Sequence, residues 1–287
     1  VKFSPPFANT FSVRRYFMTL DELLEYTETI KKDIKKINLH EDDVRHSFFG
    51  LYYSAIYDYY IGKAFFQTAK YIGEGEIKFT EKIYPFKIHA QRLYEIQDHE
   101  LLTQGYFGNL NRNVLFSVWT SFEMIISLIF EYIVSEKDIE KIILKLNNKI
   151  VKAIKNVDEN DRKIIIETLL KTSFIPINRK FNYIFERNKS NYIGNIEEDR
   201  IFLDFVVKLR NCMIHSNGVF HGKEFYYKFG DDEFLFKNKE MLLQKGPNQS
   251  EVYLKIVIKI KEIFESLIRC VENIKHIEYP DDGQNIA

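Results

Sequence analysis

The sequence predicts a mainly α-helical protein: a helical bundle with an inserted β-hairpin and an N-terminal helical region. Apolar residues recur every three or four positions over most of its 287 residues, which is the spacing of amphipathic helices. Glycine and proline are scarce, with 12 and 6 copies, whereas phenylalanine and tyrosine reach 25 and 18, and this composition favours long helices over turn-rich β-structure. With 45% hydrophobic residues, the chain is able to bury a sizeable core.

The first hundred residues contain two long helical patterns. The first covers residues 19–38, where Thr19 and Glu22 have the spacing of a capping box. The second covers residues 42–72 and is followed by Gly73, which is expected to end it. Residues 76–105 are mixed, with a further helix predicted at 89–102, and it completes the N-terminal helical region.

A second helical region follows a break in the pattern at Gly105 and Gly108. We place a domain boundary there, so that an N-terminal helical region comprises residues 1–105 and a helical domain comprises residues 106–287. In the second region, helices are predicted at 111–134, 137–155, 159–171, 177–187, 197–217 and 250–276. Before the last of these, residues 225–229 and 234–236 alternate around a Gly-Asp-Asp turn, which predicts a β-hairpin.

Within the helix predicted at 111–134, the segment at 114–134 is apolar enough to mimic a membrane span. Glu123 lies near its centre, where a charge in a bilayer costs about 2 to 4 kcal/mol. The simpler interpretation is a helix buried in the protein core. The N-terminal segment also has no continuous apolar stretch of the kind found in signal peptides. We therefore expect a cytoplasmic protein that does not associate with a membrane.

Composition also limits the chemistry. The formal net charge is zero, so any contact with nucleic acid must come from local patches. Cys212 and Cys270 lie in apolar helical faces without the spacing of zinc ligands, and we expect both to be reduced core thiols. His40, His46 and the acidic residues between them fit no compact metal motif. No metal and no cofactor are expected.

The most informative pattern lies at the end of the helix predicted at 197–217. On a helical wheel, one narrow polar stripe contains Asp204, Lys208, Asn211 and His215, and the opposite face is apolar. Arg210 flanks this stripe, and its side chain is long enough to swing toward it.

The end of this helix is predicted from the glycine that follows it. Gly218 occupies the position of a left-handed C-terminal cap, which places His215 in the last turn. A helix C-terminus favours the protonated imidazole, so His215 is expected to titrate in the functional range.

Arg210, the polar Asn211 and His215, with four residues between the arginine and the histidine, resemble the R-x(4-6)-H signature of the HEPN superfamily. HEPN domains are helical, and many act as metal-independent ribonucleases. The resemblance implies cleavage of RNA by attack of a 2′-hydroxyl on the adjacent phosphate. It assigns His215 as general base or acid, Arg210 as the phosphate-binding group, and Asn211 as the group that orients the phosphate or the histidine.

The resemblance also implies a homodimer, because one histidine cannot be both base and acid in the same step. Val207 and Ile214 flank the polar stripe as an additional apolar strip. A partner helix could cover them in an isologous contact, and packing within the chain is an equally good interpretation.

Two further features are candidate parts of the site. A basic helical face contains Lys141, Lys145, Lys149 and Lys152, and together with Lys208 these are candidate substrate-binding residues; the alternative is a solvated face. Glu123 lies among apolar residues and must find a partner or become protonated. Arg210 is a candidate partner that Glu123 would hold in position; the alternative is a carboxylate that reaches the helix edge.

The expected function is therefore an RNA endonuclease of HEPN type that binds RNA and acts as a dimer. The family resemblance suggests a toxin or phage-defence effector, with an antitoxin or effector protein as a further partner. The alternatives are a non-catalytic HEPN-like module that binds RNA or a protein partner, and a helical scaffold in which the motif is coincidental.

Overall fold

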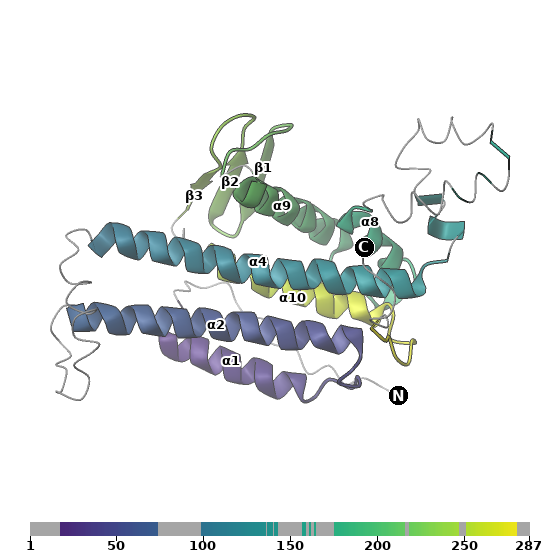
Figure 1. Cartoon of the computed structure of the whole chain (residues 1–287), viewed down its shortest axis with the longest axis horizontal. Coiled ribbons are helices and arrows are strands. Elements are labelled where there is room, and N and C mark those ends of the chain that lie inside the picture. Colours follow the sequence, from purple (N-terminus) through teal and green to yellow (C-terminus); the bar gives the residue numbers. More distant parts are fainter. Residues whose placement is uncertain are drawn as a thin grey trace. The chain divides into compact units, whose positions relative to one another are not determined.

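The computed structural model is mainly helical with a small antiparallel sheet, which confirms the predicted fold class (Figure 1). The helices are α1 (Leu20–Ile34), α2 (Val44–Gly73), α4 (His99–Ile133), α8 (Ile177–Phe185), α9 (Ile196–His215) and α10 (Val252–Arg269), with a short 3-10 helix η2 at Lys189–Asn191. The strands are β1 (Phe225–Phe229), β2 (Asp232–Phe236) and β3 (Leu243–Lys245). The structure describes residues 18–73, 99–135, 137–139, 141–142, 157–158, 161, 164, 175–215, 218–246 and 251–279.

Most of the predicted elements are present with small changes in their ends. The hairpin formed by β1 and β2 is confirmed, and β3 extends it to a three-stranded sheet in the order β1-β2-β3. The capping box at the start of α1 is also confirmed: the Thr19 hydroxyl accepts a hydrogen bond from the Glu22 amide at 3.2 Å, and the Glu22 carboxylate accepts one from the Thr19 amide at 2.8 Å. The helices predicted at 89–102, 137–155 and 159–171 lie largely outside the described residues.

The predicted break at Gly105 and Gly108 is wrong. Helix α4 runs without interruption from His99 to Ile133 and includes both glycines. A glycine inside a helix costs only about 1 kcal/mol relative to alanine, which is too little to end a helix of 35 residues. The boundary placed between residues 105 and 106 therefore falls within one continuous helix.

The chain divides into two compact units, each assembled from three separated segments. The first unit comprises Val1–Tyr26, Tyr59–Arg112 and Asn211–Lys255. The second unit comprises Thr27–Asp58, Asn113–Arg210 and Ile256–Ala287. This division differs from the predicted one at residues 105 and 106 because each long helix contributes turns to both units.

The core of the second unit is an aromatic cluster between three helices. Phe48 of α2, Phe122 of α4 and Phe264 of α10 are fully buried. The ring centroids of Phe48 and Phe264 lie 3.9 Å apart, and each lies 6.3 Å from that of Phe122. Trp119 stacks on Phe122 at 5.3 Å. These contacts place the three helices side by side, as Figure 1 shows.

Among the described residues, one stretch of α4, Gly108–Ile133, has the length and apolar composition of a membrane span. Half of its most apolar window is buried inside the protein. That burial is expected of a core helix and makes the stretch weak support for a membrane span.

The first unit contains a buried polar cluster. Lys63 of α2 donates a hydrogen bond to the Met18 carbonyl at 2.9 Å and pairs with Glu251 at 3.2 Å. The Met18 amide also donates to Glu251, at 3.2 Å. Burial raises the pKa of Glu251, although the Lys63 charge acts in the opposite direction. Nearby in sequence, Tyr59 donates a hydrogen bond from its hydroxyl to Asn111 at 2.9 Å.

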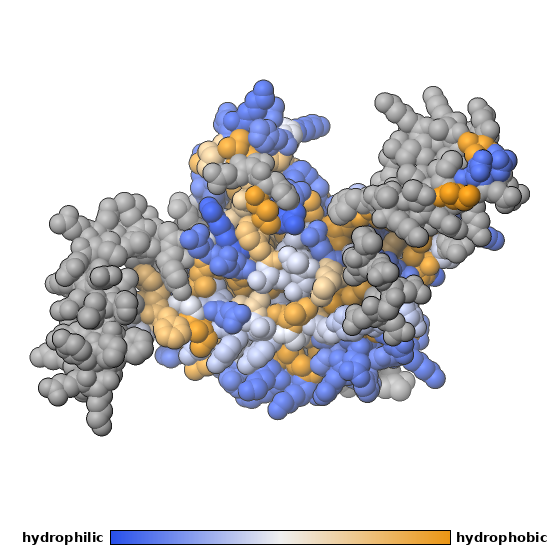
Figure 2. All heavy atoms as spheres, in the orientation of Figure 1, coloured by the Kyte–Doolittle hydropathy of each residue, from blue (hydrophilic) through white to orange (hydrophobic). Residues whose placement is uncertain are grey.

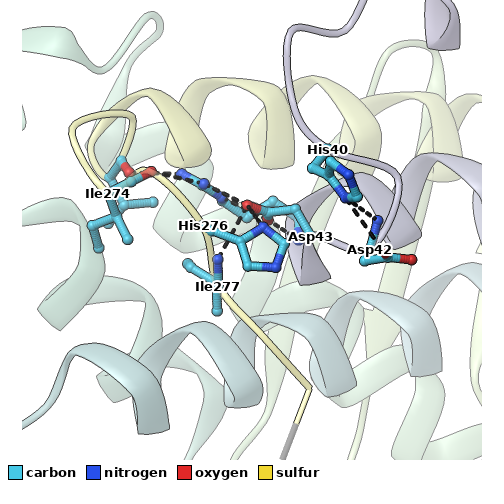
Figure 3. Close-up of polar contacts among 8 residues, drawn as sticks. His40, Asp42, Asp43, Ile274, His276 and Ile277 are labelled. Carbon is cyan, nitrogen blue, oxygen red and sulfur yellow. Dashed lines mark hydrogen bonds and ion pairs between the residues drawn. The ribbon is translucent and has the colours of Figure 1, made fainter.

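The start of α2 in the second unit is fixed by a buried ion pair (Figure 3). Asp43 accepts the Arg45 amide at 2.8 Å, as an N-cap residue does, and it also pairs with the Arg45 guanidinium at 2.6 and 2.9 Å. The same guanidinium donates to the carbonyls of Val271 and Ile274, and the Ile277 amide donates to Asp43. The pair thus links the start of α2 to the segment after α10.

Both members of this pair are inaccessible, at 0% and 1% exposure for Asp43 and Arg45. Burial alone would raise the pKa of Asp43, but the hydrogen bonds and charge of Arg45 outweigh it, so the pKa of Asp43 is lowered. The stabilisation from this carboxylate is therefore fully present above the pKa of an unfolded aspartate, about 3.9, and is lost as the pH falls through the lower folded pKa.

Replacement of Arg45 by methionine should leave a buried carboxylate without its cation. We expect the free energy of unfolding at pH 7 to fall by about 3–5 kcal/mol, measured by urea denaturation. The difference from the unmodified protein should shrink as the pH is lowered through 4, because a protonated Asp43 needs no counter-charge.

Lys36→Met is the matched control, since Lys36 pairs with Asp33 at 3.0 Å but is 61% exposed. Its effect should stay below about 1 kcal/mol. A loss in Arg45→Met no larger than in this control, or one that does not change with pH, would contradict the assigned role of the ion pair.

Candidate active site

Helix α9 carries the Arg210–His215 motif, and its start is fixed by side-chain capping. The Asn195 side-chain oxygen accepts a hydrogen bond from the Glu197 amide at 3.1 Å, and its nitrogen donates to Glu198 at 2.8 Å. One turn later, Asp199 is 3% exposed and accepts from the Tyr192 hydroxyl at 2.7 Å and from Lys259 at 2.9 Å. These contacts in the second unit anchor the first turn of α9.

The other end of α9 is closed by Gly218, as the sequence predicts. Gly218 has a φ of +87°, and its amide donates to the Cys212 carbonyl at 2.9 Å. The Cys212 thiol donates to the Gly218 carbonyl at 3.1 Å, and the Leu242 amide donates to the same carbonyl at 2.8 Å. Val219 forms an antiparallel bridge with Met241. The C-terminal end of the helix is therefore tied to the segment that leads into β3.

The apolar face of α9 is buried, which fixes the rotation of the helix about its axis. The residues with at most 3% exposure are Phe202, Leu203, Phe205, Val206, Leu209 and Cys212. On the predicted polar stripe, Asp204 and Lys208 form an ion pair one turn apart, and Asn211 is exposed. The structure therefore presents Asn211 to solvent, as predicted.

Arg210 lies at the edge of the buried face and interacts with Glu123 of α4. Burial raises the pKa of Glu123, and the positive charge of Arg210 is the largest of the influences that lower it again. Trp119 and Lys180 act in the same direction as Arg210. The structure thus brings together the acid and the base that the sequence suggested as partners.

Lys180 of α8 is a member of this charged cluster that sequence reasoning missed. Its ammonium group donates to the Ser127 hydroxyl at 2.7 Å, and the same hydroxyl donates to the Glu123 carbonyl at 2.7 Å. Burial lowers the pKa of Lys180, although Glu131 and Glu123 act to raise it. Its partners lie 49 to 57 positions away in the chain, so no local motif identifies them.

The other predicted site residues are only partly covered by the structure. Helix α9 ends at His215. The structure describes the backbone of this residue but not its side chain. Lys141 is exposed and pairs with Asp138 at 3.2 Å. The remaining lysines of the predicted basic face, Lys145, Lys149 and Lys152, lie outside the described residues.

Helix geometry sets the relation between the arginine and the histidine. Five residues at about 100° each leave the Cβ atoms of Arg210 and His215 about 140° apart around the axis. Asn211 precedes His215 by one turn and shares its side of the helix. Arg210 would therefore need the length of its side chain to reach a group held beside Asn211.

A metal centre finds no support in the part of the chain that the structure describes. No cluster of three or more histidine, cysteine or acidic side chains suited to a metal ion occurs there. Cys212 and Cys270 are buried and unlinked, and burial raises the pKa of both thiols, that of Cys270 to about 11.

Comparisons of this chain with protein-family models, with characterised proteins and with solved structures found no match. The resemblance to HEPN domains therefore depends on the residues of the motif and on their helical setting.

Replacement of Gly218 by alanine should destabilise the protein, because a side chain strains a residue with φ of +87° and its Cβ would lie 2.9 Å from the Met241 methyl carbon. We expect the free energy of unfolding to fall by about 1–2 kcal/mol in urea denaturation.

Gly50→Ala in α2 provides a control of opposite sign, since no heavy atom lies within 4 Å of the position that its Cβ would occupy. That substitution should leave stability unchanged or raise it by up to about 1 kcal/mol. Equal effects of the two substitutions would contradict the role of Gly218 as a left-handed helix cap.

Proposed function

We propose that the protein is a metal-independent RNA endonuclease of HEPN type that acts through Arg210, Asn211 and His215. The observation that carries this proposal is the placement of the motif in the last two turns of α9, with the apolar face buried and the helix end capped by Gly218. A rigid helix end holds catalytic groups more accurately than a mobile loop does.

The proposed reaction is a transesterification within the RNA strand. The 2′-hydroxyl loses its proton to a general base and attacks the adjacent phosphorus, so that a new 2′-oxygen–phosphorus bond forms. The bond from phosphorus to the 5′-oxygen of the next nucleotide breaks, and that oxygen takes a proton from a general acid. His215 supplies one of these two proton transfers, a contribution typically worth about 10² to 10⁴ in rate.

Arg210 would bind the scissile phosphate and stabilise the charge that develops on its oxygens. Glu123 supports this role, because its negative charge keeps a long side chain oriented at the edge of the buried face. Asn211, which is exposed one turn before His215, would donate its amide to the phosphate or to the substrate ribose. Lys208, Lys141, Lys145, Lys149 and Lys152 are proposed to bind the flanking phosphates.

The second proton transfer is assigned to the histidine of a second subunit. The apolar strip next to the motif includes Ile214, which is 43% exposed, and Val207, which is half-buried. A two-fold axis beside this strip would bring two copies of the motif together and cover Ile214. By the same family resemblance, we propose a role as a cytoplasmic toxin or phage-defence effector that an antitoxin or effector protein regulates.

RNA cleavage in the presence of EDTA tests the catalytic proposal. The unmodified protein should cleave RNA, and His215→Ala and Arg210→Ala should each lower the rate at least about 100-fold. Arg210→Lys should remain impaired, because a lysine cannot bind a phosphate through two parallel hydrogen bonds.

His221→Ala and Arg179→Ala are the controls, since both side chains are exposed and lie outside the motif. Melting temperatures should stay the same in all variants. Undiminished cleavage by His215→Ala would refute the assignment. RNA binding without any cleavage by the unmodified protein would favour the non-catalytic module.

The dimer has its own test, which is the mass in solution by light scattering. We expect twice the 34.3 kDa of the chain. Ile214→Asp should yield the monomer and abolish cleavage, because it places a charge in a buried apolar contact. Ile201→Asp is the control, as Ile201 is 53% exposed on the same helix but lies away from the strip. A monomer that cleaves RNA at full rate would exclude the two-subunit site.

A further inference from the structure

One face of the three-stranded sheet in the first unit carries two aligned rows of side chains. Side chains alternate between the faces of a strand, and the strand register places Tyr226, Leu235 and Leu243 in one row across β1, β2 and β3. The same register places Lys228, Glu233 and Lys245 in the next row. We call these six residues the outer face of the sheet.

The opposite face of the sheet is turned into the protein. Phe234 and Phe236 of β2 are buried, with at most 1% exposure. Phe236 contacts Phe225 and Phe220, with ring centroids 5.7 and 5.3 Å apart. The aromatic side chains that suggested the hairpin therefore pack mainly on the inner face, and they fix which residues the outer face exposes.

The outer face combines exposed apolar and basic groups. Tyr226 is 54% exposed and Leu243 is 45% exposed, and Met241 next to β3 is 63% exposed. Lys228 and Lys245 are also exposed. Figure 2 shows hydrophobic and hydrophilic side chains intermixed in the part of the surface that carries the strands. Leu235, between Tyr226 and Leu243, is half-buried, and an apolar row of this kind flanked by charge is a candidate interaction surface.

The chemistry of this face fits single-stranded nucleic acid. An exposed tyrosine on a sheet offers a flat ring on which a base can stack, and leucine neighbours extend that apolar surface. The lysines of the next row lie two residues further along β1 and β3 on the same face, where they can neutralise phosphates of the bound RNA. Desolvation and the hydrogen bond and charge of Glu233 raise the pKa of Tyr226.

The outer face has a fixed connection to the end of α9. Gly218, which caps that helix, accepts the amide of Leu242, and β3 begins at the next residue. The exposed Asn211 and the sheet belong to the same compact unit. A strand bound across the sheet would therefore be held at a constant relation to the last turn of α9.

We propose that the outer face of the sheet is a binding platform for single-stranded RNA, with Tyr226 stacking on a base and Lys228 and Lys245 contacting phosphates. This inference rests on the proposed function, because it specifies the substrate of the proposed nuclease as unpaired RNA. It also names the surface that would guide that RNA toward α9. Its binding test is independent of cleavage.

The test measures the affinity of a fluorescent single-stranded 2′-O-methyl RNA by anisotropy. This probe has no 2′-hydroxyl, so it remains intact whether or not the protein is a nuclease. Tyr226→Ala should weaken binding about 5- to 100-fold, the range expected for the loss of one stacked base, and Tyr226→Phe should restore the affinity.

Tyr132→Ala is the matched control, because Tyr132 is also 54% exposed but lies on α4. Lys228→Ala and Lys245→Ala should each weaken binding and reduce the slope of log affinity against log salt by about 0.7. Lys275→Ala, at another exposed lysine, should not change the slope.

The platform would be overturned if the unmodified protein does not bind the probe, or if Tyr226→Ala and Tyr132→Ala have equal effects. It would also be overturned if the sheet binds a protein segment and Tyr226→Ala blocks that binding while the affinity for RNA stays constant. If RNA is not cleaved but the probe binds in a Tyr226-dependent way, the nuclease proposal fails and the platform stands.

Discussion

The rotational setting of α9 is the constraint on which the candidate site depends. Six side chains on one face of this helix are buried, and a shift of one residue would turn that face by about 100° and expose them. Burial of each large apolar side chain contributes about 1.5–3 kcal/mol, so the observed setting is strongly preferred. Exposure of Asn211 and the edge position of Arg210 follow from it.

Charged groups inside both units are held in compensated clusters. Asp43 and Arg45 neutralise each other at the start of α2, Lys63 and Glu251 do so in the first unit, and Glu123 lies under the influence of Arg210 and Lys180. An unpaired ion in such surroundings would cost several kcal/mol. These clusters therefore give specificity to the packing of helices whose contacts are otherwise apolar.

Sequence periodicity was sufficient to predict the helices that have one buried face, because the burial that stabilises them also creates the pattern. It was insufficient at Gly105 and Gly108, where neighbouring turns maintain α4 in spite of two poor helix formers. Strand β3 was also missed, because three residues are too few to show an alternation and because they pair with residues of β2 that lie 8 to 12 positions away.

The positions of some residues of the candidate site could be predicted from the sequence, and those of others could not. The cap at Gly218 and the exposure of Asn211 follow from local rules of helix ends and faces. The interaction of Arg210 with Glu123 was suggested by one buried acid in an apolar helix, whose need for a partner is a general electrostatic requirement. The approach of Lys180 could not be predicted, because it is fixed by the packing of α8 against α4 and not by any pattern near Lys180 itself.

Under the proposed function, the interaction with Glu123 would also limit how Arg210 acts on a phosphate. An arginine that is fully neutralised by a carboxylate would attract a second anion only weakly. Glu123 is not such a carboxylate, because burial raises its pKa and so disfavours its charged form. A raised pKa means that Glu123 holds its negative charge less readily than an exposed glutamate does. Lys180 also acts on Glu123, so this carboxylate is shared between two cations and does not neutralise Arg210 alone. The same acid can thus orient Arg210 without cancelling the field that a phosphate would experience.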